Sequence, residues 1–161
     1  MDLPLLSALF MGFALTLYVV LDGFDLGVGI LLLFQPAIAS RNHMVDSITP
    51  TWDGNETWII MAGVTLLAAF PTAYSILLPA FYIPVILMLL ALGCRGVSFE
   101  FRMQTIRYRH AWDVAFAVGS LVAAFMQGVI LGGLLQGVTV QNQRFGGSVL
   151  RAPNKMDFSS T

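Results

Sequence analysis

The sequence predicts an all-α protein of the polytopic membrane class, a transmembrane four-helix bundle. Of its 161 residues, 57% are hydrophobic and 11% are charged. Soluble domains average about 25% charged residues, so this chain has too few charges for an ordinary soluble surface, and its mean hydropathy of +0.80 agrees. The composition also excludes a nucleic-acid-binding protein, which needs a basic patch. A single cysteine, Cys94, excludes an internal disulfide or a multi-cysteine metal site.

Uncharged runs locate the helices. They cover residues 3–21, 26–40, 57–94 and 114–143, and only Asp22 and Asp25 interrupt the first two. A helix needs roughly 20 apolar residues to cross a bilayer, so the run 57–94 is long enough for two helices, with Pro71 as the expected turn. We therefore expect a membrane domain over 1–140 with helices at about 5–33, 53–71, 75–94 and 113–138, followed by a polar C-terminal tail over 141–161.

Basic residues are unevenly distributed between the two sides of this predicted bundle. The segments after the first and third helices share one side and hold Arg41, Arg95, Arg102, Arg107 and Arg109. The opposite side holds the N-terminus, the turn at 72–75 and the tail, which contains Arg144, Arg151 and Lys155. Because basic segments tend to stay in the cytoplasm, we expect the first side to be cytoplasmic and the N-terminus to be external.

Four acidic residues lie in or beside the predicted helices. Asp22 and Asp25 belong to the first helix, and Asp53 and Glu56 begin the second. The members of each pair are three residues apart and therefore share a helix face. A charge near the centre of a spanning helix costs about 2.5–3.5 kcal/mol on insertion scales, so such residues are functional candidates by default. We expect these four to be candidates for a proton path.

Capping and ion pairing explain the same acids without proton transfer. Asp53 lies where a helix N-cap is expected, and Asp22 and Asp25 lie at a helix end if the first helix stops at Leu21. Arg95 and Arg102, on the same side, are expected ion-pair partners. Glu100, between them, is a further candidate for a structural ion pair. Spacing alone leaves both interpretations open.

Histidine placement argues against haem ligation by this chain alone. Haem iron takes His, Cys, Met/His or Tyr ligands, but both histidines, His43 and His110, fall in expected loops. No metal site is predicted either. The glycines have a simpler interpretation, because Gly23/Gly27 and Gly128/Gly132 match the spacing that lets membrane helices pack closely.

Five motifs in order resemble subunit II of the cytochrome bd-type quinol oxidases, with two of them closer to the cyanide-insensitive branch. They are the segments Leu21–Gly29 (LDGFDLGVG), Pro50–Trp58 (PTWDGNETW), Ala68–Tyr74 (AAFPTAY), Arg95–Arg102 (RGVSFEFR) and Leu134–Gly137 (LLQG). The resemblance covers roughly residues 5–140. The family's second subunit is longer, with further helices, so the chain corresponds to its N-terminal half.

The resemblance implies a non-haem subunit of a terminal oxidase in the bacterial cytoplasmic (inner) membrane. Such an oxidase oxidises quinol and reduces O2 to water, with haem b and haem d in the partner, subunit I. The second subunit would support assembly and deliver protons from the cytoplasm, in contact with lipid and with a structural quinone. The aspartate of the family's Trp-Asp-Gly-Asn motif, proposed to conduct protons, is Asp53 here, and Asp25 is a second candidate.

Two other functions compete with an oxidase subunit. A small proton-coupled transporter would use Asp22, Asp25 and Asp53 and would conduct ions in liposomes without a partner. A truncated structural or assembly fragment would bind the partner without restoring oxidase activity. The ordered motifs favour the oxidase subunit.

Overall fold

The computed structural model describes residues 2–105, 107–138, 140–141 and 144–145. Its helices are α1 (Leu3–Leu31), extended by the 3-10 turn η1 (Leu32–Phe34), then α2 (Ile38–Ile48), α3 (Trp52–Ala69), α4 (Pro71–Ala80), α5 (Tyr82–Gln104) and α6 (Arg109–Gln136). Two short strands, β1 (Val140–Gln141) and β2 (Arg144–Phe145), pair antiparallel, with Val140 opposite Phe145. Because helices make up nearly all of the described residues, the all-α class is confirmed. Most of the predicted tail over 141–161 lies outside the described residues.

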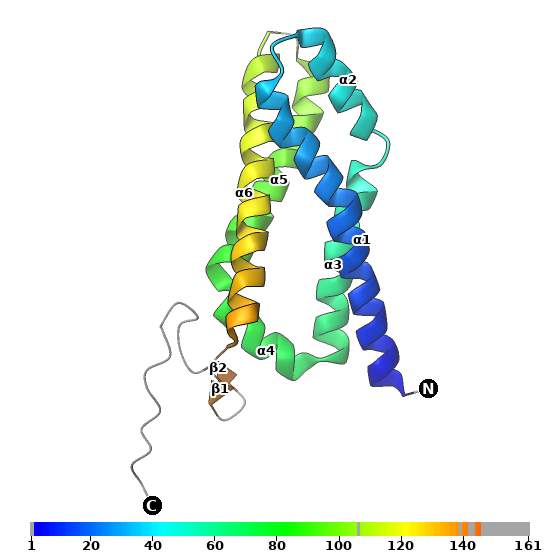
Figure 1. Cartoon of the computed structure of the whole chain (residues 1–161), viewed down its shortest axis with the longest axis vertical. Coiled ribbons are helices and arrows are strands. Elements are labelled where there is room, and N and C mark those ends of the chain that lie inside the picture. The colour runs from blue at the N-terminus through cyan, green and yellow to red at the C-terminus, as the bar shows by residue number, and fades with distance from the viewer. Residues whose placement is uncertain (1, 106, 139, 142–143, 146–161) are drawn as a thin grey trace, which may run out of the picture.

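Two antiparallel helix pairs form the body of the structure. α3 runs back along α1, and α6 runs back along α5 (Figure 1). α1 also packs on α6, which joins the pairs. The N-terminus lies at the end of the molecule where α4 connects α3 to α5, and α2 lies at the other end, which we call the α2 end (Figure 1).

Within the described residues, three helical segments are long and apolar enough to cross a membrane: Leu3–Phe34, Tyr82–Gln104 and Arg109–Gln136. They overlap three of the four predicted spans. α3 has 18 residues and is therefore ~27 Å long, but polar residues occupy its first two turns. A fourth crossing by α3 stays a prediction.

The predicted span over 75–94 was wrong in its bounds. The chain forms α4, breaks at Phe81 and then forms α5 from Tyr82 to Gln104. Pro84 explains the break, because it has no N–H to donate to the carbonyl of Ala80 one turn earlier. Since α5 starts later, Arg95 and Arg102 lie inside it and are buried, although both were expected in a loop.

α2 is a helix that the sequence did not predict. η1 ends before Pro36, and Gln35 is extended as a residue preceding proline prefers to be. The chain then turns into α2, which contains His43. His110 likewise lies in the first turn of α6, so the expectation that both histidines fall in loops was wrong.

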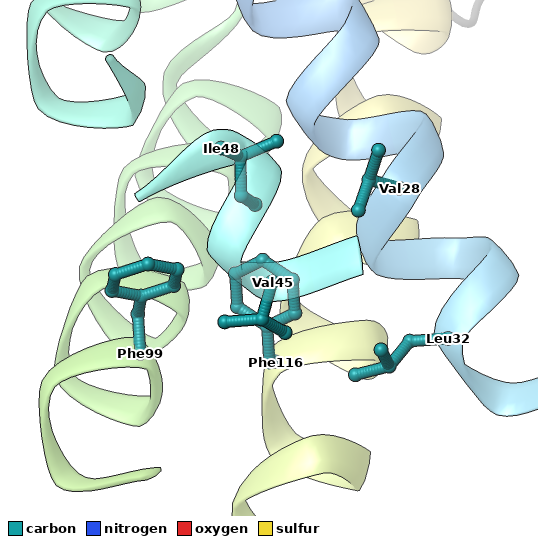
Figure 2. Packing of buried hydrophobic residues seen from close by; sticks show 6 residues of the cluster. All are labelled: Val28, Leu32, Val45, Ile48, Phe99 and Phe116. Atoms are coloured by element: carbon teal, nitrogen blue, oxygen red, sulfur yellow. The ribbon is translucent and has the colours of Figure 1, made fainter. Parts of the chain in front are cut away.

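An apolar cluster holds the α2 end together. Six buried residues from α1, η1, α2, α5 and α6 meet there (Figure 2): Val28, Leu32, Val45, Ile48, Phe99 and Phe116. The Phe99 ring lies 5.9 Å from Phe116 and 5.1 Å from Trp52 of α3. Because burying each large apolar side chain contributes about 1.5–3 kcal/mol, this cluster fixes the positions of all the helices that reach it.

The glycines at which two helices approach closely are not the ones that the sequence spacing predicted. A Cβ at Gly23, Gly27, Gly128 or Gly132 would meet nothing within 4 Å, so these glycines do not pack against helices of the described chain. A Cβ at Gly29 would lie 2.8 Å from the Ser120 Cβ, and one at Gly119 would lie 2.9 Å from the Ala91 carbonyl oxygen. Gly29 therefore sets the approach of α1 to α6, and Gly119 sets that of α5 to α6.

Candidate functional site

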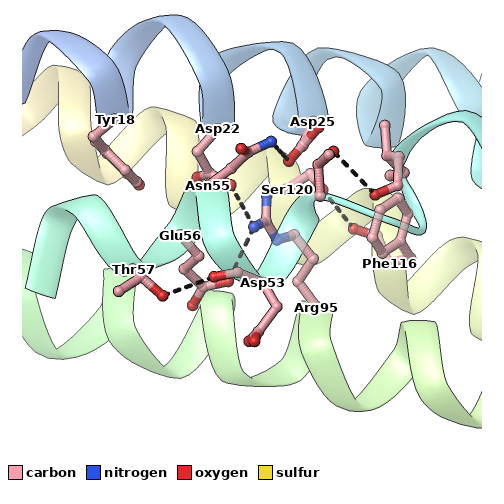
Figure 3. Close-up of polar contacts among 12 residues, drawn as sticks. Tyr18, Asp22, Asp25, Asp53, Asn55, Glu56, Thr57, Arg95, Phe116 and Ser120 are labelled. Carbon is pink, nitrogen blue, oxygen red and sulfur yellow. Dashed lines mark hydrogen bonds and ion pairs between the residues drawn. The ribbon is translucent and has the colours of Figure 1, made fainter.

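Arg95 of α5 lies at the centre of a buried polar cluster between three helices (Figure 3). Its Nη2 donates to Asp22 Oδ1 of α1 at 2.5 Å and to Glu56 Oε2 of α3 at 3.0 Å. The Arg95 and Asp22 side chains are 1% and 0% exposed, and that of Glu56 is 22% exposed. Because an isolated buried charge is very costly, these ion pairs explain how the arginine is accommodated.

Helix periodicity places Arg95 on the inner face of α5. The residues three and four positions away on either side, Leu92, Ala91, Ser98 and Phe99, are all buried, as expected for neighbours on one face. The arginine therefore belongs to the core-facing stripe of the helix.

A second buried carboxyl group extends this cluster along α1. Asp25, 1% exposed, accepts a hydrogen bond from Asn55 Nδ2 of α3 at 2.8 Å. Asp25 follows Asp22 by three residues on the same face, and Gly29 continues that face against Ser120. We call the group of Asp22, Asp25, Asn55, Glu56 and Arg95 the Arg95 cluster.

Several atoms of the Arg95 cluster are buried without a hydrogen-bond partner among the described residues. They are Asp22 Oδ2, Asp25 Oδ1, Arg95 Nε and Arg95 Nη1. Most buried polar atoms in native proteins are paired with protein groups or with ordered water. The three carboxyl groups also outnumber the single guanidinium. With all three carboxyl groups ionised, the cluster would therefore carry excess negative charge, which the binding of one proton would lower.

A small pocket between α3 and α5 opens beside the cluster. It has a volume of about 140 Å³, and we call it the entry pocket; its lining residues are Trp52, Asp53, Glu56, Thr57, Ile60, Leu92, Gly93 and Gly96. Asp53 is exposed at this pocket. Glu56 lines the pocket and also binds Arg95. Glu56 thus links the surface to the buried carboxyl groups.

A separate polar cluster lies at the α2 end. Buried Asp113 of α6 accepts from Arg102 Nε, and Arg41 Nη1 lies 3.4 Å from Asp113 Oδ2. Arg102 Nη2 also donates to Asn42 at 3.0 Å, and Arg41 Nη1 lies 3.1 Å from His110 Nδ1. We call this group the Arg102 cluster. It ties α2 to α5 and α6.

The apolar cluster lies between the two polar clusters. Along α1, Val28 and Leu32 follow Asp25; along α5, Phe99 stands between Arg95 and Arg102. On α6, Phe116 stands between Asp113 and Ser120. The two sets of ion pairs are therefore separated by a layer of apolar side chains.

The structure brings together some of the predicted site residues and not others. Asp22, Asp25, Glu56 and Arg95 meet in one cluster, and Asp53 lies at its pocket. Arg102 pairs with Asp113 instead, and Glu100 is exposed on α5, with no ion pair among the described residues. Sequence reasoning missed Asn55, Asp113 and Arg41 as site residues. Asp113 did give a signal, because it borders an uncharged run as Asp22 does.

The described part of the chain does not gather side chains for a metal ion. There, no group of three or more His, Cys, Asp or Glu side chains is arranged to hold a metal ion. His110, in the first turn of α6, has its Nδ1 engaged by Arg41, and His43 is exposed on α2.

Comparison with known proteins identifies the family. The model of the family "Cytochrome bd terminal oxidase subunit II" matches residues 3–157. The chain is 42% identical over 137 residues to cytochrome bd-I ubiquinol oxidase subunit 2 of Escherichia coli (strain K12), which is 83% of this chain and 35% of that protein. It is 37% identical over 139 residues to cytochrome bd ubiquinol oxidase subunit 2 of Bacillus subtilis (strain 168), which is 84% of this chain and 40% of that protein.

The chain is also 39% identical over 137 residues to the probable cytochrome oxidase subunit 2 of Haemophilus influenzae (strain ATCC 51907 / DSM 11121 / KW20 / Rd). The match covers 83% of this chain and 35% of that protein. The chain thus spans about 35–40% of the length of these curated relatives. The family match covers nearly all of the chain and agrees with the order of motifs in the sequence. The chain belongs to the cytochrome bd terminal oxidase subunit II family.

Proposed function

We propose that this chain acts in a bd-type quinol oxidase of the bacterial cytoplasmic (inner) membrane, as a non-haem part of subunit II. In this role it packs against the haem-bearing subunit I and delivers protons from the cytoplasm for the reduction of O2 to water. The haem groups, held by subunit I, supply the oxygen chemistry. The observation that carries the proposal is the placement of the carboxyl groups, because Asp53 and Glu56 line the entry pocket and Arg95 joins Glu56 to buried Asp22.

Each residue of this proposed path has a distinct task. Asp53, exposed at the pocket, takes a proton from water. Glu56 receives it and faces the buried cluster through Arg95. Arg95 bonds to both Asp22 and Glu56 and so holds the carboxyl groups of α1 and α3 together. Asn55 orients Asp25 by donating to one of its oxygens.

The outer surface suits contact with lipid and with a partner. Many large apolar side chains of α1, α5 and α6 are exposed, among them Phe13, Leu90 and Leu131. A bilayer, an apolar partner helix or a quinone tail covers such faces without the need for polar groups. The arginine-rich α2 end is placed in the cytoplasm under this proposal, as basic segments prefer.

Co-purification with subunit I tests the assembly role. We would express the tagged chain with the haem-bearing subunit in a host that lacks its own second subunit and record the reduced-minus-oxidised spectrum of the eluate. We expect haem b and haem d bands. An eluate that contains the folded chain but no haem would contradict docking by these residues.

Asp53→Asn tests the proton role in the same complex. We expect slower O2 uptake per haem with unchanged haem content, because the amide can neither bind nor release the proton. Glu100→Gln is the matched control, since Glu100 is exposed on α5 and away from the pocket. If Asp53→Asn and Glu100→Gln both keep the parental rate, Asp53 has no part in proton uptake.

A further inference from the structure

Tyr18 of α1 and Gln127 of α6 form a polar contact next to the Arg95 cluster. Gln127 Nε2 donates to the Tyr18 hydroxyl oxygen at 2.5 Å. Tyr18 is 3% exposed, and both residues belong to helices that are apolar enough to cross a membrane. Neither residue belongs to the proton path proposed above. That path does not explain why the Tyr18 hydroxyl and the Gln127 amide meet between two apolar helices.

Tyr18 lies on the same face of α1 as Asp22 and Asp25. It precedes Asp22 by four residues, which is one helical turn, so their side chains are neighbours on α1. Figure 3 shows both side chains directed from α1 toward α3 and α5. Asp22 Oδ2 is buried and has no hydrogen-bond partner among the described residues. A buried acceptor therefore lies one turn from a buried hydroxyl.

The direction of the Gln127 hydrogen bond leaves the proton of Tyr18 free. A tyrosine hydroxyl has one donor and can also accept, and here its oxygen accepts from the amide. Its own proton needs an acceptor, because a buried donor that is left unsatisfied destabilises the fold. Asp22 Oδ2 is the neighbouring acceptor without a partner, either directly or through one water molecule.

We infer that Tyr18 continues the proton path beyond Asp22 toward the middle of the membrane and that Gln127 positions its hydroxyl. This inference rests on the proposed function and extends it by ~6 Å along α1, the rise of the four residues from Asp22 to Tyr18. α1 and α6 are in close contact at Gly29 and Ser120 and draw apart toward the N-terminal end of α1 (Figure 1). The Tyr18–Gln127 contact lies where they diverge.

The transfer itself conserves atoms and charge. At rest the Tyr18 hydroxyl donates to Asp22, and once Asp22 is protonated the hydroxyl turns to donate to a water molecule. Asp22 then gives its proton to the Tyr18 oxygen as the Tyr18 hydroxyl proton passes to that water, which leaves Asp22 ionised and the water carrying the proton. A new O–H bond forms on the oxygen whose old O–H bond breaks, and no electron pair leaves the tyrosine. Gln127 holds the oxygen in line during this exchange and is itself a positioning residue.

A packing role is the competing explanation. Polar side chains on membrane helices form interhelical hydrogen bonds that stabilise helix packing modestly, and under this explanation Tyr18 and Gln127 serve only to join α1 to α6. The two explanations differ in a measurable way. Loss of a packing contact changes stability and assembly, whereas loss of a relay changes the rate per assembled enzyme and its solvent isotope effect.

The main test is Tyr18→Phe in the complex with subunit I, with O2 uptake measured per haem in H2O and in D2O. We expect the rate to fall about tenfold or more, the isotope effect to rise and the haem content to stay unchanged. Tyr82→Phe is the matched control, because Tyr82 is 60% exposed. Gln127→Leu should give a smaller fall in rate, and Gln136→Leu, at an exposed site on the same helix, should give none.

Asp25→Asn, measured in parallel, separates this inference from the proposed function. If Asp25→Asn slows turnover and Tyr18→Phe does not, the relay is overturned and the carboxyl path stands. If neither variant slows turnover, the carboxyl path fails as well. If Tyr18→Phe lowers haem content while the rate per haem is parental, the contact is only a packing contact and the relay is overturned.

Infrared spectroscopy of the purified chain in lipid nanodiscs tests the contact without the partner. The carboxyl absorption that disappears in Asp22→Asn should shift in Tyr18→Phe, because a hydrogen bond to that carboxyl group is lost. Tyr82→Phe should leave it in place. An Asp22 band that is identical in the parental chain and in Tyr18→Phe would overturn the contact on which the relay depends.

Discussion

Arg95 Nη2 lies 2.5 Å from Asp22 Oδ1, although 73 residues separate the two in the chain. Glu56 of a third helix completes the ion pairing of this guanidinium. One arginine thus fixes the relative positions of α1, α3 and α5 at the same place where protons would be exchanged. Structural and functional effects of substitutions in this cluster must therefore be measured separately.

Arg95→Gln should destabilise the fold strongly. It leaves Asp22 buried without its cation, and breaking a buried ion pair in this way costs about 3–5 kcal/mol. We expect a lower midpoint of unfolding, followed by circular dichroism in detergent with increasing denaturant. Arg107→Gln is the control, since Arg107 is exposed, and should leave the midpoint unchanged. Equal midpoints for the two variants would show that the ion pairs do not hold the helices together.

Glu56→Gln should reduce turnover more than it reduces stability. The amide keeps a hydrogen-bond acceptor for Arg95 but cannot carry a proton, so we expect O2 uptake per haem to fall by about 10- to 100-fold. Haem content measures assembly in the same sample. A parental rate in Glu56→Gln would remove this residue from the path and leave it as an ion-pair partner only.

Gly29→Ala should separate α1 from α6. The added Cβ would contact Ser120 Oγ and lie 2.8 Å from Ser120 Cβ, and such overpacking costs about 1–3 kcal/mol. Gly23→Ala is the control on the same helix, because a Cβ there meets nothing within 4 Å. Combining Gly29→Ala with Ser120→Gly should restore part of the stability. Thermal unfolding of the four chains gives the comparison.

Asp113→Asn should release α2 from the bundle. Asp113 pairs with Arg102 and Arg41, and a weaker bond to α2 should show as faster amide hydrogen exchange across residues 38–48. A loss of about 1–3 kcal/mol corresponds to the cost of unsatisfied buried groups. Asp46→Asn, at an exposed position on α2, should leave exchange as it is. Unchanged protection in Asp113→Asn would mean that the apolar cluster alone holds α2.

The sequence predicted the fold class because composition and uncharged runs act over long segments and tolerate local errors. The expected turn at Pro71 coincides with the start of α4, but the second break, at Phe81 between α4 and α5, was missed because Pro84 was not considered. A proline inside an apolar run marks a helix start as well as a break. Which of several prolines ends a span depends on how the following helix packs.

Residue pairing was harder to predict than residue type. The acids at Asp22, Asp25 and Glu56 stood out because charge is rare in apolar runs, and Arg95 was among the expected partners. The Tyr18–Gln127 contact joins residues 109 apart, and neither type is unusual enough to draw attention by itself. The glycine pairs failed for a related reason, because spacing shows which residues share a face but not which face meets another helix.

The apolar cluster between the two polar clusters has a consequence for the route of water. Val28, Phe99 and Phe116 lie across the interior between the Arg95 cluster and the Arg102 cluster. A proton arriving along the bundle axis from the α2 end would have to pass this layer, which offers no hydrogen-bonding side chain. Under the proposed function, water therefore reaches the Arg95 cluster sideways, through the entry pocket that Glu56 lines between α3 and α5. A bulky adduct bound at the flank of the protein would stop it, whereas charge changes at the α2 end would not.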